Sequence, residues 1–592
     1  MNQKPVIPDN RNFLLAIILS MAIIFGWQFF FATPAAKKAQ EQATQQQQQT
    51  TQQSGAVPGA ALVQTIDRQA ALVAGPRVKI DTPELAGSVN LTGAQIDDVQ
   101  LKNYRVEAKA SSPIVTFLSP SGTANAYFVE QGLVGVVGQT AKLPDSKTPW
   151  QAAPGAVLTT DQPLVLTWDN GEGLVFRREI SISEQYVFKV RQIVDNRTAN
   201  PVYVLPYARI QRQDTPVTAG FWVFFEGLLG VQNGVLTESH YSDVSEVGGK
   251  VENTSTGGWL GFTDKYWATA LIPNQASELV ATYQHFKVGN RDAYQADYLA
   301  KQPVMVAARN SAALEDHLFA GAKIVQTIDK VGAAHKIDKF ELMIDWGWFK
   351  FLTQPMYYLL DWAKSIMGNF GLAILLVTVI VKLALFPLAN RSYASMSKMK
   401  KLQPEMERIK AEFPDDRMKQ QQATMELYKK EKVSPLSGCL PIFIQIPIFF
   451  ALYKVILTTI DLRHAPFFGW IHDLSVPDPT SLFNLFGLVP WSPPQILMLG
   501  VWPILMGITM WVQMRLNPTP ADPIQASMFN WMPLIFTFML SSMPAGLVIY
   551  WSWSNLLSIL QQSYIMKKNG VELNLLGNMR ESIPFLKKKT AT

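Results

Sequence analysis

Met528 to Ile565 reads MFNWMPLIFTFMLSSMPAGLVIYWSWSNLLSILQQSYI, 38 residues without one Asp, Glu, Lys or Arg. A helix rises about 1.5 Å per residue, so one straight helix of this length would overshoot a hydrocarbon layer of about 30 Å almost twofold. We therefore expect two membrane spans, Met528–Met543 and Ala545–Ile565, divided at Met543-Pro544-Ala545-Gly546. This stretch identifies the chain as a polytopic α-helical membrane protein.

Further apolar stretches precede this one. They predict spans at Phe370–Leu388, Leu440–Ile460 and Gln495–Gln513. Near the N-terminus, Phe13–Phe31 is uncharged over 19 residues, whereas the apolar region of a signal peptide has only about 7–15. We expect a retained anchor there, and the small residues at 32–36 leave cleavage open as the alternative.

Lysine and arginine are spread unevenly among the connecting segments. The 390–435 loop holds eleven of them, the 462–494 loop holds only Arg463, and the tail at 567–592 is basic. Because positively charged loops stay in the cytoplasm, this pattern assigns both termini and the 390–435 loop to that side. The result is a six-span membrane protein, N-in and C-in, with residues 61–340 on the outer side of the membrane.

Residues 61–340 differ in composition from the apolar stretches, being dense in Val, Thr, Ser, Gly and Pro. Short runs such as Val78–Ile80 and Tyr186–Val190 are separated by turn-forming clusters such as Asp169-Asn170-Gly171. The pattern predicts a large all-β sandwich, with one short helix near 312–327 leading back to the membrane.

Two connecting segments flank this β domain. The Gln-rich segment 37–60 is expected to be a tether, and 341–355, with Trp346 and Trp348, to be an interfacial amphipathic helix. The single cysteine, Cys439, lies outside the β domain, whose core must therefore be held without disulfides. The expected order is an anchor at 1–36, the tether at 37–60, the β domain at 61–340, the interfacial helix at 341–355, a five-span core at 356–566 and a basic tail at 567–592.

Lys382 is the charged residue that we single out within a span. It lies six residues before Leu388, about 9 Å from the cytoplasmic end, where even a lenient scale gives a cation a cost of about 2.5–3.5 kcal/mol. Thr378, one turn earlier, shares its helical face. Either this face lines a watered cavity, or the flexible lysine stem snorkels to the interface. We interpret Lys454, six residues before Ile460, as a lysine that snorkels to the outer surface.

Several function classes are disfavoured. The five later spans contain no Asp or Glu, which counts against an ion-coupled transporter. A transporter or channel with Lys382 as its anion site is the weaker alternative. His464 and His472 flank an aromatic loop and fit an interface better than a metal site. The chain lacks HExxH, GxSxG, P-loop and Rossmann motifs, so we expect neither an enzyme nor a cofactor or metal.

Polar side chains and prolines recur inside the other predicted spans. The amides and hydroxyls are Gln445, Thr509, Gln513, Thr537, Ser558, Gln561 and Gln562. Hydrogen bonding between helices, common in any bundle, accounts for them as well as an open groove does. Pro447, Pro503 and Pro533 are expected to kink or splay their helices.

The 390–435 loop carries a methionine-rich stripe. Its apolar residues recur at spacings of three and four, namely Met396, Met399, Leu402, Met406, Ile409 and Phe413. After Pro414-Asp415-Asp416 a similar stripe continues through Met425 and Tyr428. The pattern predicts a cytoplasmic hairpin of two antiparallel helices. It is either a solvated hairpin or a surface for adaptable contacts with nascent chains or ribosomal RNA.

Four ordered motifs in the five-span core resemble those of the YidC-type membrane protein insertases. They are Val379-Ile-Val-Lys-Leu-Ala-Leu-Phe-Pro387, Lys432-Val-Ser-Pro-Leu-Ser-Gly-Cys-Leu-Pro441, Gln445-Ile-Pro-Ile-Phe449 and Pro544-Ala-Gly-Leu-Val-Ile-Tyr550. The plan of anchor, periplasmic β domain and five-span core with a cytoplasmic hairpin is also similar. This resemblance implies a hydrophilic groove, open to cytoplasm and lipid but closed outside, with one essential positive charge.

The resemblance assigns that charge to Lys382, where many members carry arginine. It places Gln445, Tyr550 and Trp551 with Thr378 at the groove. The apolar slide for substrates is assigned to Pro447 and Phe449.

The implied clients are nascent membrane proteins, whose polar segments enter the groove while their apolar segments slide into lipid. Further implied partners are the Sec translocase, the ribosome through the hairpin and basic tail, and membrane lipids. No small-molecule substrate is implied.

Overall fold

The computed structural model describes residues 65–571, apart from 219–223, 247–248, 415, 432, 434–439, 492, 495–497 and 518–522. The predicted anchor at 13–31, the tether at 37–60 and the tail beyond 571 lie outside the described residues. The chain divides into two compact units. One comprises Val63–Pro518 and Met532–Thr592, and the other is described only at Pro523–Trp531.

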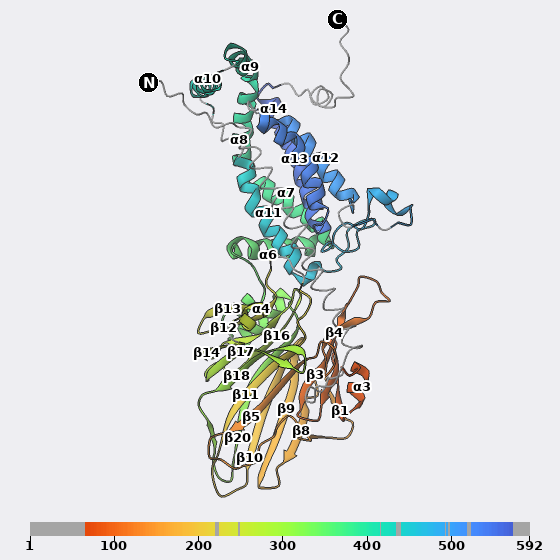
Figure 1. Ribbon diagram of the computed structural model, residues 1–592, viewed down its shortest axis with the longest axis vertical. Helices are drawn as coiled ribbons and strands as arrows, with labels where there is room; N and C mark the ends of the chain where they lie inside the picture. Colours follow the sequence, from red (N-terminus) through yellow and green to blue (C-terminus); the bar gives the residue numbers. More distant parts are fainter. Residues whose placement is uncertain are drawn as a thin grey trace, which may run out of the picture. The chain divides into compact units, whose positions relative to one another are not determined.

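Two sheets make up the β domain (Figure 1). Within the described residues, one sheet has eleven strands, in the order β14 (Lys250–Thr256), β17 (Glu278–Val288), β18 (Arg291–Ala300), β11 (Val202–Gln213), β5 (Tyr127–Gly135), β3 (Gln95–Arg105), β2 (Leu85–Asn90), β1 (Arg77–Asp81) and β7 (Val157–Leu158), with β19 (Val304–Val306) on β11 and β4 (Ile114–Leu118) on β3. The other has nine, in the order β13 (Val235–Ser239), β12 (Gly227–Gln232), β15 (Trp259–Thr263), β16 (Trp267–Ile272), β20 (Asn310–Ala322), β10 (Val187–Asn196), β9 (Leu174–Glu184), β8 (Leu164–Asp169) and β6 (Gln151–Ala152).

The two sheets pack face to face, which confirms the predicted sandwich. The ring of Tyr127 on β5 meets the ring of Phe262 on β15 edge-on, with 5.9 Å between centroids. Arg178 on β9 is buried and donates to the backbone carbonyls of Ala94 and, on β5, Gln131. Successive side chains of a strand point to opposite faces of the sheet, which sets which of them face inward. On β1, for example, Lys79 is exposed and the side chains on either side of it are buried.

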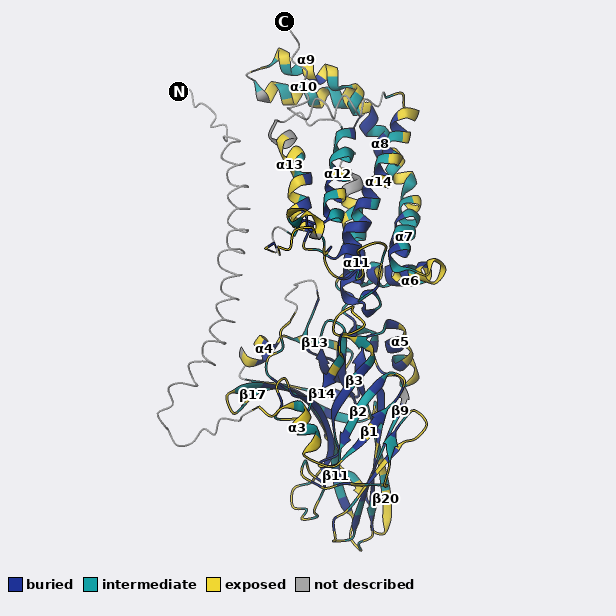
Figure 2. Cartoon of the chain, turned by 90° about the vertical axis from the view of Figure 1, so that its right-hand side faces the viewer, coloured by how far each residue is buried: buried dark blue, intermediate teal, exposed yellow. Residues whose placement is uncertain are grey.

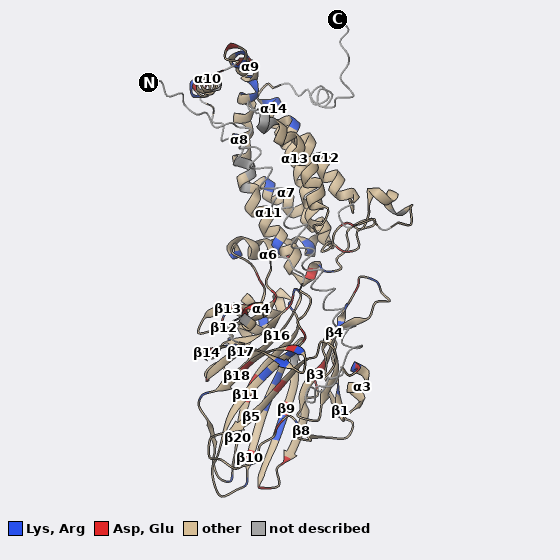
Figure 3. Ribbon diagram, viewed as in Figure 1, with Lys and Arg blue, Asp and Glu red and all other residues tan. Residues whose placement is uncertain are grey.

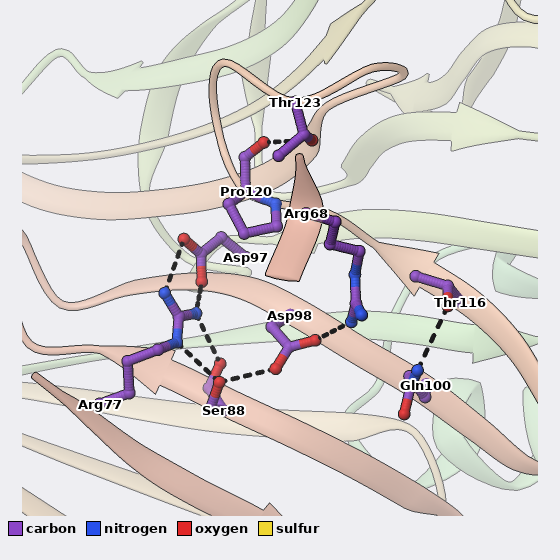
Figure 4. Close-up of polar contacts among 9 residues, drawn as sticks. All are labelled: Arg68, Arg77, Ser88, Asp97, Asp98, Gln100, Thr116, Pro120 and Thr123. Atoms are coloured by element: carbon purple, nitrogen blue, oxygen red, sulfur yellow. Dashed lines mark hydrogen bonds and ion pairs between the residues drawn. The ribbon is translucent and has the colours of Figure 1, made fainter. Parts of the chain in front are cut away.

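A cluster of ion pairs fixes the start of the described chain to this sandwich (Figure 4). Arg68, on the short helix α3 (Arg68–Val73), pairs with Asp98, and Arg77 on β1 pairs with Asp97. Ser88 accepts from Arg77 Nε at 2.7 Å and donates to Asp98 at 2.6 Å. Burial raises the pKa of Asp97, and the Arg77 guanidinium opposes this shift. Each buried carboxylate thus has a cationic partner.

The predicted helix at 312–327 is wrong in its position. Residues 310–322 form β20, which pairs in register with β10 (Phe319 opposite Val187) and with β16. The helix that leaves the sandwich is α5, at Val325–Ala334. The last five residues of β20 are all buried, so no polar alternation marks them as a strand. Strand pairing decides their conformation.

The rest of the described chain is helical. Its elements are α4 (Tyr241–Glu246) and η2 (Phe340–Met343), followed by α6 (Lys350–Met367), α7 (Phe370–Ala384), α8 (Phe386–Lys401), α9 (Gln403–Glu412), α10 (Arg417–Lys430), α11 (Leu440–Thr458), η4 (Ile460–Leu462), η5 (Leu482–Gly487), α12 (Val501–Leu516), α13 (Pro523–Leu540) and α14 (Ala545–Lys568). Lys and Arg are sparse along α12 to α14 and more frequent on α8 to α10 (Figure 3). By length and hydropathy together, no described helix qualifies alone as a membrane span, and only the pair α6 and α7, bent by 120°, passes such a test.

Helix boundaries confirm the predicted break near Pro544. The helix α13 ends at Leu540, and α14 begins at Ala545 directly after the proline. The first free amides of α14, on Ala545 and Gly546, donate to the carbonyls of Val476 and Leu474. The break is therefore stabilised by the preceding loop as well as by the proline.

Other helices differ from expectation in detail. The amphipathic helix α6 begins at Lys350, later than the start of the interfacial helix expected at 341–355. The residues just before it, 344–349, are not helical. Pro503 lies in the first turn of α12, where no intrahelical bond is lost, so the predicted kink is absent there. Pro447 and Pro533 do lie inside α11 and α13.

Most of the described residues of the 390–435 loop are helical, as predicted, and α9 and α10 pack against each other. The hydroxyl of Tyr428 on α10 lies 3.4 Å from the sulfur of Met406 on α9. Both helices remain exposed or half-buried over most of their length (Figure 2).

Candidate functional site

A cavity opens among five helices of the core. It contains about 660 Å³ of empty space, part of it open to solvent. The lining comes from α6, α7, α8, α11 and α14 and comprises Met356, Val377, Thr378, Val381, Lys382, Leu385, Leu388, Ala389, Ser392, Tyr393, Gln445, Ile448, Leu452, Tyr550 and Gln561. None of these is a carboxylate, so among the described residues of the lining one ammonium is the only formal charge.

That ammonium belongs to Lys382, on the last turn of α7. Its Nζ donates to Ser558 Oγ at 2.8 Å and to Gln445 Oε1 at 3.4 Å. Gln445 in turn donates to the hydroxyl of Tyr550. Neutral oxygens thus solvate the cation without cancelling its charge. Among the residues that the structure describes, no carboxylate lies within ion-pair distance of this ammonium.

Thr378 lies one turn from Lys382, as the helical spacing predicts, and lines the same cavity. It is buried and donates to the carbonyl of Ile374 at 2.6 Å. The hydroxyl proton is therefore committed to its own helix, and the oxygen lone pairs remain available as acceptors.

Trp551 does not line the cavity, although its neighbour Tyr550 does. The indole packs against Phe449 of α11 and Phe536 of α13, with centroids 4.6 and 5.6 Å apart. Phe449 also stacks on Tyr453 at 6.0 Å. These rings form an aromatic cluster that joins α11, α13 and α14. Pro447 lies two residues before Phe449 and is half-buried.

From the sequence alone, Ser558 was left open between a groove and an ordinary interhelical bond, and Tyr393 was missed as a site residue. Ser558 is the nearest partner of the Lys382 ammonium, and Tyr393 lines the cavity from α8. The spacing along α14 carried a usable signal, because Tyr550, Ser558 and Gln561 are separated by intervals that return to one helical face. No comparable spacing marks Tyr393, because its place at the cavity depends on how α8 packs against the other helices.

Lys454 does not snorkel, which corrects the interpretation from sequence. Its side chain is 2% exposed, and its Nζ lies 2.7 Å from Asp345 Oδ2. The carboxylate of Asp345 also accepts from the backbone amides of Phe225 and Gly347. A buried cation needs such a partner, and this one comes from the segment before α6, outside any predicted span.

Two family models match the chain, and together they cover most of it. The model described as 60Kd inner membrane protein matches residues 362–572, and the one described as YidC periplasmic domain matches residues 77–359. The boundary between them falls in α6.

Similar proteins match over nearly the full length. The membrane protein insertase YidC of Bradyrhizobium diazoefficiens is 51% identical, with 98% of this chain and 100% of that protein covered. The one of Rhizobium meliloti is 50% identical, covering 97% and 98%. A crystal structure described as an active YidC insertase aligns with 82% of this chain and 91% of its own, at 18% identity and a TM-score of 0.35. On the sequence matches, the chain belongs to the YidC family of inner-membrane protein insertases and carries the family's periplasmic domain.

Proposed function

We propose that the cavity around Lys382 is the groove through which this insertase receives polar segments of nascent membrane proteins. The observation that carries the proposal is the set of partners of the ammonium. Ser558 and Gln445 hold it with neutral oxygens, in a cavity whose lining has no carboxylate. A positive charge that lacks a carboxylate partner at such a place attracts acidic or polar polypeptide.

The magnitude of this attraction is adequate for the task. Two opposite charges 4 Å apart interact by about 4 kcal/mol at an effective dielectric constant of 20. Moving a charged side chain to the centre of a bilayer costs about 2.5–3.5 kcal/mol on the insertion scale. One contact with Lys382 is therefore as large as the whole cost for one acidic residue of the client, without ATP hydrolysis.

The proposed topology has six spans, with both termini and the 390–435 hairpin in the cytoplasm and the β domain in the periplasm. Its support is the distribution of lysine and arginine among the loops. In this orientation the Lys454–Asp345 pair lies toward the periplasm, at the far end of α11 from Gln445. A buried ion pair there fits a groove that is closed on the outside.

The apolar segment of a client is proposed to leave along α11 and α13. The aromatic cluster of Phe449, Trp551 and Phe536 joins these helices. Along α13 a row of large apolar side chains is exposed, namely Leu534, Ile535, Phe538 and Met539. Apolar side chains that face lipid make a path with little cost for a second apolar segment. Pro447 and Phe449 are proposed to be part of this slide.

Two further partners belong to the proposal. The hairpin of α9 and α10 exposes Met418 and Met425 among basic residues, which suits contacts with a ribosome or an emerging chain. Cooperation with the Sec translocase is proposed on the family resemblance and would be tested by crosslinking from the β domain.

The test is insertion of a client with an acidic extracellular segment into proteoliposomes that contain only the purified protein. Lys382→Ala is expected to reduce insertion to the level of protein-free vesicles, and Lys382→Arg to preserve it. Lys364→Ala, which removes an exposed lysine of α6 outside the cavity, is the matched control and should insert normally. Equal insertion by Lys382→Ala and the control would refute the role of the ammonium.

A further inference from the structure

The loop between η4 and α12 exposes an apolar surface that the insertase groove does not use. Many of its large exposed side chains lie between residues 482 and 491, namely Leu482, Phe483, Leu485, Phe486, Leu488, Val489 and Trp491. Leu488 is 85% exposed. Contiguous apolar surface of this kind is unusual where a protein faces water and marks a contact with lipid or another protein.

The base of this loop is fixed to the start of α12 by a buried carboxylate. Asp478 is 3% exposed and accepts from the Trp502 amide in the first turn of α12 at 3.0 Å. Its other oxygen accepts from Thr480 and from the indole of Trp470. A carboxylate at a helix N-terminus is favourable, and here it also ties both ends of the loop together. The apolar tip is therefore presented from a rigid base.

The tip itself is held by its own backbone. The amides of Phe486 and Val489 donate to the carbonyls of Ser481 and Asn484. Leu485 and Phe486 adopt the left-handed region, with φ of 50° and 58°, which bulky residues rarely occupy. Such strain is retained where the local conformation serves a contact. A turn whose amides are paired internally can also enter an apolar medium at low cost.

We propose that residues 482–491 dip into the outer leaflet of the membrane beside α12. The inference rests on the proposed topology, in which α12 begins at the periplasmic surface. From Pro479 to Met514 the sequence has no Asp, Glu, Lys or Arg, so the loop lacks the charged rim typical of a protein interface. The next described helix along the chain, α12, also exposes large apolar side chains, Leu505 and Ile508. Trp491 and Trp470 add the indole rings that concentrate at bilayer interfaces.

The test uses a fluorescent label on single cysteines in the full-length protein. Cys439 is the chain's one cysteine, so Cys439→Ser gives a clean background. Phe486→Cys and Leu488→Cys are labelled with NBD, and Val137→Cys, on a fully exposed turn of the β domain, is the matched control. Each variant is reconstituted in phosphatidylethanolamine–phosphatidylglycerol vesicles with and without lipids that carry a nitroxide near the headgroup.

The labels at 486 and 488 are expected to show blue-shifted emission and to lose most of it to the nitroxide lipids, while the label at 137 does neither. Water-like emission at 486 and 488 overturns the inference. Blue-shifted emission that the nitroxide lipids do not quench also overturns it, because a protein surface then covers the loop. Insertion is measured in the same vesicles: normal insertion with a loop in water refutes this inference alone, and a quenched loop without insertion refutes the groove proposal alone.

Discussion

Removing either partner of the buried ion pair between Lys454 and Asp345 should destabilise the outer end of the helical core. The stability losses of the two single variants should not add up in the double variant. Asp345→Ala removes the partner of an ammonium whose side chain is 2% exposed. It also leaves the amides of Phe225 and Gly347 without their acceptor. A buried charge left wholly uncompensated costs about 3–5 kcal/mol, and the loss here should be at or below the lower end of that range because Glu238 also acts on the Lys454 ammonium.

Removing the lysine instead of the carboxylate should cost less stability. In Lys454→Met the carboxylate of Asp345 keeps its two backbone donors, and the methionine fills most of the lysine volume. We expect a loss of about 1–3 kcal/mol, the usual cost of one unsatisfied buried partner. In the double variant no charge is left unpaired, so its loss should be well below the sum of the two single losses.

The assay is thermal unfolding of the four proteins in one detergent, combined as a double-mutant cycle. A coupling free energy of about 1–3 kcal/mol is expected for residues in direct contact. Strict additivity, or a neutral Asp345→Ala variant, would refute the account of Lys454 as a buried and paired cation. Snorkelling to the headgroups would produce that outcome.

Three further predictions can be checked independently. Ser558→Ala removes the 2.8 Å partner of the Lys382 ammonium and should lower the insertion rate less than Lys382→Ala does, whereas Ser558→Thr keeps the hydroxyl and should insert normally. Trp551→Ala opens the aromatic cluster on Phe449 and should cost about 3–5 kcal/mol of stability, measured by thermal unfolding. Burial raises the pKa of Asp316 from 3.8 to about 6, so the folded state holds this proton more tightly than the unfolded state, and stability falls as pH rises from about 4 to about 6. Asp316→Asn should therefore raise the unfolding free energy by up to about 3 kcal/mol at pH 8 and change it little at pH 4; equal effects at both values would contradict this.

The parts of the fold that follow from local rules could be predicted from sequence. The break at Pro544 follows from length, because the apolar stretch is too long for one span. Lys382 stands out because a lysine is costly in an apolar helix, and the structure places it in the cavity with Thr378 and Gln445. Each of these inferences uses only neighbours along one helix.

The errors share a different cause, namely partners that are distant in sequence. Lys454 was misjudged because Asp345, which neutralises it, lies outside any span and far away in the chain. The helix expected at 312–327 is wrong over residues 312–322 because β10 pairs with Asn310–Phe319 and β16 pairs with His317–Ala322. Ser558 was left undecided because a hydroxyl in a helix can form an ordinary interhelical bond as readily as it can line a groove. Long-range packing decides each of these cases.

Site-specific photo-crosslinking to a stalled nascent chain tests the central claim most directly. A photo-reactive residue at Val381, which lines the cavity on α7, should crosslink to the polar extracellular segment of the client. The matched position is Leu383, which is exposed on the same helix and does not line the cavity. The account predicts crosslinks to the polar segment from 381 and their near absence from 383. Equal crosslinking from both positions, or none from 381, would contradict it.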